Sequence, residues 1–190
     1  MIETAREIFN DSIQSKQRFI SGEKNLQAVV SAANIITESI KKGGKVLVFG
    51  NGGSAADSQH LAAELVVRFE KERKAIPAVA LTTDTSILTA VSNDYDFNRA
   101  FSRQVEALAS DEDVVVAIST SGNSLNVLEG VKTSKSKELP VIVLAGKDGG
   151  KLAPLGDIAI IASSDNTARI QEIHVTVIHI ICKLVEDAFA

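Results

Sequence analysis

Apolar side chains recur every three or four positions over residues 2–42, which is the spacing of an amphipathic helix. The pattern breaks at Ser21-Gly22 and stops at Gly43-Gly44, and glycine is typical just beyond the C-terminus of a helix. The pattern therefore predicts an N-terminal helical hairpin over residues 2–42. Both helices precede the first predicted strand and carry an apolar stripe that needs a surface to cover it. We therefore expect these helices to be used in oligomerisation.

From Lys45 onward, short β-branched apolar runs alternate with segments at helical spacing. We expect five strands, at Val46–Phe49, Ala78–Leu81, Val114–Ile118, Val141–Leu144 and Ile158–Ile161. We expect helices near residues 54–69, 84–109 (in one or two pieces), 124–137, 149–154 and 167–188. Strands this apolar are typical of a parallel sheet buried on both faces. The alternation predicts one α/β domain over residues 1–190, a three-layer sandwich with a five-stranded parallel sheet flanked by helices.

Composition narrows the function classes. The 190 residues carry a formal net charge of −4 and no basic stripe, so we expect no nucleic-acid partner. No apolar run reaches the length of a membrane span and the N-terminus does not read as a signal peptide, so we expect a cytoplasmic protein with no membrane partner. The single cysteine, Cys182, lies among apolar residues and is interpreted as a buried structural side chain.

Two turns rich in glycine and serine each join a predicted strand to a helix. The first is GNGGSA at 50–55, and the second is STSGNS at 119–124. Backbone N–H groups and hydroxyls at such a junction bind anions, because they lie at a helix N-terminus. The first turn fits a dinucleotide fingerprint only formally. The acidic residues about 20 positions on, Glu70 and Glu72, lie in a polar helix-to-strand connection, and the next strand ends only at Thr82-Thr83-Asp84. The second turn holds four hydroxyls in six residues and is interpreted as a phosphate site.

Titratable residues lie on the helices beside these turns. His60 and Glu64 are one helical turn apart and share a face. This spacing fits metal ligation, acid–base chemistry or a simple surface hydrogen bond. The last predicted helix carries Gln171, His174 and His179 among apolar residues. Spacing alone does not choose between the two histidines.

The sequence as a whole resembles the phosphoheptose isomerases, the sedoheptulose 7-phosphate isomerases of the sugar isomerase (SIS) fold. The resemblance rests on GNGGSAADSQHLAAEL at 50–65, Asn93-Asp94, ISTSGNS at 118–124 and ARIQEIH at 168–174. It implies the SIS fold and a homotetramer with active sites between subunits. It implies one Zn²⁺ per subunit, held by His60, Glu64, Gln171 and His179. It implies substrate contacts at Asn51, Gly52, Gly53, Glu64, Asn93, Asp94, Ser119, Thr120, Ser121, Ser124 and Gln171.

The resemblance also implies an activity. D-sedoheptulose 7-phosphate is converted through an enediol to D-glycero-D-manno-heptose 7-phosphate, the first step toward ADP- or GDP-heptose and lipopolysaccharide. Glu64 would act as the base and His179 as its acid/base partner. The alternative is a non-catalytic SIS-fold tetramer that binds a replication-initiator protein or senses a sugar phosphate. Such proteins do not need the acid and histidine that this chain has at positions 64 and 179.

Overall fold

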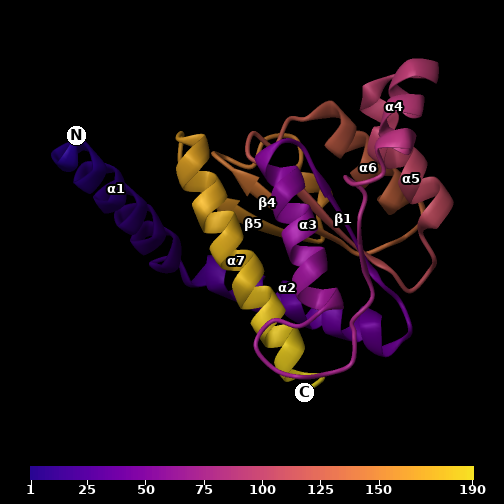
Figure 1. The fold of residues 1–190 in the computed structure, drawn as a ribbon, viewed down its shortest axis with the longest axis horizontal. Helices are drawn as coiled ribbons and strands as arrows, with labels where there is room; N and C mark the ends of the chain where they lie inside the picture. The colour runs from indigo at the N-terminus through magenta and orange to yellow at the C-terminus, as the bar shows by residue number, and fades with distance from the viewer.

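The computed structural model describes residues 1–190 and is built on a five-stranded parallel sheet, as predicted (Figure 1). The strands lie in the order β2-β1-β3-β4-β5. They span Val46–Gly50 (β1), Ala78–Ala80 (β2), Val114–Ser119 (β3), Val141–Gly146 (β4) and Ile158–Ala162 (β5). The strand order reverses between β1 and β3, and in an open α/β sheet this switch point is where ligands bind, outside the carboxyl ends of the strands.

Helices cover both faces of the sheet and give the three layers. One core contains side chains from α2 (Glu23–Lys41), α3 (Gly53–Val66) and α7 (Thr167–Asp187). The other contains side chains from α5 (Ala100–Leu108) and α6 (Leu125–Ser136). Alternate strand residues enter alternate cores, because successive side chains of a strand point to opposite faces. In β1, Val46 and Val48 join the first core, whereas Leu47 and Phe49 join the second.

The N-terminal helices are present, but they do not form the predicted hairpin. α1 (Ile2–Ile20) projects away from the body of the molecule rather than lying back along α2 (Figure 1). Only Ser15 and Phe19 of α1 are buried, and Phe9 is 72% exposed. A stripe of exposed apolar side chains therefore runs along α1, and it consists of Ile2, Ile8, Phe9, Ile13 and Ile20.

The other helix predictions hold with one exception. The predicted segment 84–109 is two helices, α4 (Thr85–Asp94) and α5, joined through a short 3-10 turn at Phe97–Arg99. The predicted helix at 149–154 is wrong, because this stretch contains only a 3-10 turn at Ala153–Leu155. Gly149 and Gly150 have φ values of +90° and +55°, which a right-handed helix cannot contain.

Cys182 is fully buried in α7, as predicted. Burial, together with the negative charge of Glu64, raises the pKa of its thiol to about 12. The thiolate is therefore strongly disfavoured in the folded protein. None of the helices combines the length and the apolar character needed to cross a bilayer.

Candidate active site

The first turn lies at the carboxyl end of β1, next to the end of β3. Gly50 pairs with Ile118 across the two strands, so both turns begin side by side. The amides of Asn51 and Asn126 exchange two hydrogen bonds of 2.8 Å, which tie the first turn to the start of α6. The Asn51 side chain is thus engaged within the protein. Gly52 has a φ of +56° and is followed directly by α3, so the turn presents backbone N–H groups at the helix N-terminus.

The second turn forms a cradle of hydroxyl and amide donors. The hydroxyls of Ser119 and Ser124 are 3.1 Å apart. The backbone N–H groups of Thr120, Ser121 and Ser124 donate no hydrogen bond within the protein. Gly122 has a φ of +63°, and a Cβ there would collide with the Gly149 carbonyl, so the cradle needs glycine at this position. Free donors before the N-terminus of α6 match the needs of a phosphate group.

His60, Glu64 and His179 converge between two neighbouring helices. α3 and α7 lie side by side (Figure 1) and share one apolar core. The Nε2 atoms of His60 and His179 are 2.8 Å apart, and Glu64 Oε1 is 3.6 Å from His60 Nε2. The Glu64 side chain is 22% exposed, so its carboxylate is shielded but reachable.

Gln171 lies two turns before His179 on α7 and faces the same space. A cavity of about 650 Å³ is lined by Gly53, Gln171 and His179. The amide of Gln171 approaches α3 so closely that a Cβ on Gly53 would be 2.2 Å from its Nε2. The predicted residues of the first turn and of α7 therefore meet at one cavity, and glycine permits this approach.

His174 does not line this cavity, whereas His179 does. The structure thus distinguishes the two histidines, between which sequence spacing could not choose. Its Nε2 is 3.1 Å from the Ala145 carbonyl, and its Nδ1 is buried without a partner. Burial lowers the pKa of His174 to about 4, although the bond to Ala145 opposes the shift. His174 is therefore a neutral core residue.

Asp57 is a further candidate that the sequence reasoning missed. It lines the same cavity, is only 7% exposed, and its Oδ2 is buried without a partner. Burial raises its pKa to about 6, and the charge of His60 partly opposes this rise. The signal was present in the sequence, because Asp57, His60 and Glu64 lie at helical spacing on one face of α3.

Asn93 and Asp94 are not brought to the two turns within this chain. They lie at the end of α4, are exposed, and make a 2.8 Å hydrogen bond to each other. Neither side chain has a hydrogen bond to residues of either turn. Their predicted contact with a substrate stays a prediction.

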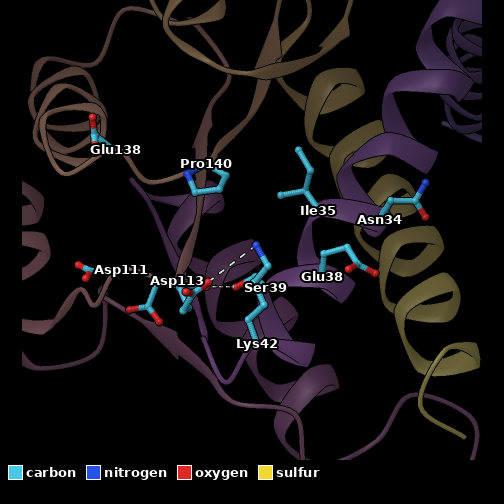
Figure 2. Close-up of a pocket in the computed structure, with 10 residues that line it drawn as sticks. Asn34, Ile35, Glu38, Ser39, Lys42, Asp111, Asp113, Glu138 and Pro140 are labelled. Carbon is cyan, nitrogen blue, oxygen red and sulfur yellow. Dashed lines mark hydrogen bonds and ion pairs between the residues drawn. The ribbon is translucent and has the colours of Figure 1, made fainter.

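A second cavity, of about 450 Å³, lies at the opposite end of the sheet (Figure 2). It lies where α2 ends and where the segments leading into β3 and β4 begin, at the amino ends of the strands. Its buried polar groups are engaged within the protein: Ser39 donates to the Glu112 carbonyl, and Asp113 pairs with Lys45. The cavity that is lined by α3 and α7 and includes Gly53 of the first turn therefore remains the candidate active site.

The donor set of the candidate site fits zinc in its chemistry. Two imidazole nitrogens, a carboxylate and an amide oxygen are available from His60, His179, Glu64 and Gln171. No group of three or more His, Cys, Asp or Glu side chains is already arranged as a metal site. Two nitrogens on one tetrahedral zinc lie about 3.3 Å apart, given Zn–N bonds of about 2.0 Å. The two imidazoles, at 2.8 Å, need to separate by about half an ångström to share the ion.

Comparisons with known proteins agree with this geometry. Residues 7–146 match the model of the SIS domain family. A phosphoheptose isomerase from Aquifex aeolicus (strain VF5) is 51% identical over 187 residues, which cover 98% of this chain and 97% of the relative. The chain belongs to the phosphoheptose isomerase family of SIS-domain proteins.

Solved structures of phosphoheptose isomerases have the same architecture. The protein from Neisseria gonorrhoeae is 43% identical with a TM-score of 0.91, and the alignment covers 97% of this chain and 98% of that one. The protein from Francisella tularensis is 38% identical with a TM-score of 0.93, over 98% of both chains. These matches confirm the predicted SIS fold.

Proposed function

We propose that the protein is an aldose–ketose isomerase that converts D-sedoheptulose 7-phosphate to D-glycero-D-manno-heptose 7-phosphate. Membership of the phosphoheptose isomerase family supports this reaction. The observation that carries it is the convergence of His60, Glu64 and His179 beside a cavity that is lined by α3 and α7 and includes Gly53 of the first turn. A carboxylate and two imidazoles in one cluster can move protons between carbon and oxygen atoms.

In this mechanism the donors of the second turn hold the phosphate. The free N–H groups and hydroxyls at 119–124 fix one end of the substrate, which orients its other end for reaction. The Glu64 carboxylate removes the proton from C1 of the ketose and returns it to C2 of the enediol. His179 moves the proton between the two oxygens. The shielded position of Glu64 keeps the transferred proton from bulk water.

We include zinc in this proposal, held by His60, Glu64, Gln171 and His179. When bound, the ion would polarise the carbonyl group and stabilise the negative charge on the enediolate. Gln171 Oε1 and the two imidazoles would hold it while Glu64 keeps one carboxylate oxygen free for the proton.

We also propose a homotetramer with its active sites between subunits. Exposed apolar side chains on α1, such as Phe9 and Ile13, need a partner surface to cover them. Asn93 and Asp94 are exposed and make no hydrogen bond to either turn within this chain, so their predicted contacts with the substrate favour a site that a neighbouring protomer completes.

The non-catalytic alternative receives no support from the site. A protein that only binds a replication initiator or senses a sugar phosphate has no need of Glu64 placed 3.6 Å from His60, with His179 beside it. The two carboxyl-end turns alone would suffice for sensing. The three-residue cluster therefore favours catalysis.

The experiment is to incubate the purified protein with D-sedoheptulose 7-phosphate, with and without a metal chelator, and to follow the aldose by NMR. We expect turnover that the chelator removes and that Glu64→Gln abolishes. Glu72→Gln is the matched control, because its side chain is 87% exposed on the segment that follows α3. Absence of turnover by the metal-loaded protein, or full activity of Glu64→Gln, would refute the proposed function.

A further inference from the structure

The segment that follows α3 wraps around the C-terminal end of α7 (Figure 1). One side chain of α7 holds it there. The Glu186 carboxylate is fully buried and accepts hydrogen bonds from the backbone N–H groups of Phe69, Glu70 and Lys71, at 2.8, 2.8 and 2.9 Å. Burial alone would raise the pKa of Glu186, but these three donors and Arg73 outweigh it and hold that pKa below its usual value.

Arg73 completes this arrangement from the same segment. Its Nε is 3.3 Å from Glu186 Oε1, and both side chains are almost completely buried. Its Nη2 donates to the Glu64 carbonyl and its Nη1 to the Leu65 carbonyl, each at 2.8 Å. A buried ion pair is costly to desolvate and is a weak source of net stability. What it does here is fasten the backbone at Glu64, on α3, to the end of α7.

The same arrangement reaches His179 through an aromatic ring. The amide of Phe69 is held by Glu186, and the ring of Phe69 lies against the imidazole of His179 with the ring centroids 5.6 Å apart. Glu186 is seven residues beyond His179, so the two side chains lie on the same face of α7 two turns apart. One ion pair thus constrains the backbone of Glu64 and the ring packed on His179.

We propose that Arg73 and Glu186 are positioning residues that hold Glu64 and His179 in register for proton transfer, with Phe69 as the contact to His179. The inference rests on the proposed function for the reaction itself. Arg73 and Glu186 act at a distance, because both side chains are almost completely buried and cannot touch the substrate.

The kinetic test uses conservative variants. Arg73→Lys keeps the charge opposite Glu186, but a single ammonium cannot also serve the two carbonyls that the guanidinium fork reaches. Phe69→Leu keeps an apolar side chain and removes the ring, whereas Phe69→Tyr restores the ring. We expect Arg73→Lys and Phe69→Leu to lower kcat at least about tenfold with KM changed less than about threefold, since misplacement by about 1 Å can cost about 100-fold.

Three more variants serve as control, rescue and direct test of the ion pair. Asp187→Asn is the matched control: it adjoins Glu186, is 40% exposed in its ion pair with Lys71, and should leave kcat unchanged. Phe69→Tyr should recover most of the rate lost in Phe69→Leu. Glu186→Gln leaves Arg73 buried without its partner, so this variant is first checked for folding by circular dichroism.

An NMR readout tests the positioning without any turnover. The chain has only three histidines, so ¹³C labelling of the imidazoles gives a simple spectrum. The Phe69 ring should displace the His179 signals in the native protein. Phe69→Leu should remove this displacement, Arg73→Lys should shift the signals toward the Phe69→Leu values, and Asp187→Asn should change neither.

The outcomes separate the two proposals. An unchanged His179 signal in Arg73→Lys overturns the positioning role, and so does a shifted signal with unchanged kcat, because the ion pair would then be structural only. If the native protein fails to turn over the sugar phosphate, the proposed function is lost, and the NMR comparison alone decides whether Arg73 holds the ring against His179.

Discussion

His174 should make the folded protein lose stability as the pH falls from 6.5 toward 4. Its folded pKa is about 4, against an ordinary value of 6.5, because burial disfavours the imidazolium. Above pH 6.5 the side chain is neutral in both states. Between the two values only the unfolded chain binds the proton, so the free energy of unfolding decreases. The difference between these two pKa values corresponds to about 3 kcal/mol in total, of which about 2 kcal/mol is lost by pH 5.

The assay is urea unfolding at pH 7.5, 6.0 and 5.0, at one protomer concentration, because assembly also contributes to apparent stability. His174→Gln is the comparison: its amide can still donate to the Ala145 carbonyl, but it does not titrate near these pH values. We expect the native protein to lose about 2 kcal/mol relative to the variant between pH 7.5 and 5.0. A difference that does not depend on pH would refute the neutral, buried assignment of His174.

Three further predictions concern the site and the assembly. Replacing Ser121 and Ser124 together by alanine should raise KM more than it lowers kcat; an effect on kcat alone places the phosphate elsewhere. His179→Ala should lower both the rate and the zinc content measured by elemental analysis, and an unchanged zinc content contradicts the proposed ligand set. The double variant Phe9→Ser, Ile13→Ser removes two exposed apolar side chains from α1 and should weaken assembly, as measured by analytical ultracentrifugation. An intact oligomer argues against α1 as an interface.

The parts of the fold that depend on local pattern could be predicted from the sequence. Strands such as Val114–Ser119 are continuous apolar runs, and both turns combine glycine with small polar residues, so their places follow directly. The direction of α1 could not be predicted, because it depends on how the chain continues through Ser21-Gly22 rather than on the stripe of apolar residues. At 149–154 the helical spacing was misleading, since two glycines in the left-handed region override it.

The site shows the same limit. The pairing of His60 with Glu64 follows from helical spacing, whereas the meeting of His60 with His179 depends on how α3 packs on α7. In the sequence, Glu186 is one more acidic residue near the end of the last predicted helix. Only the path of the segment after α3 buries it and turns it into the acceptor of three backbone donors.

Because Cys182 is buried, its reaction with a thiol reagent can report how often the folded core opens. The lone sulfur has no solvent-exposed surface and a pKa of about 12, so thiol reagents and mild oxidants find almost no reactive thiolate while the chain is folded. When a thiol reagent reacts faster than the structure recloses, modification of this sulfur occurs at the rate at which the core around α7 opens. The natural cysteine can therefore be used, without an engineered probe, to measure how long the folded state persists, with purified protein or in a cell extract.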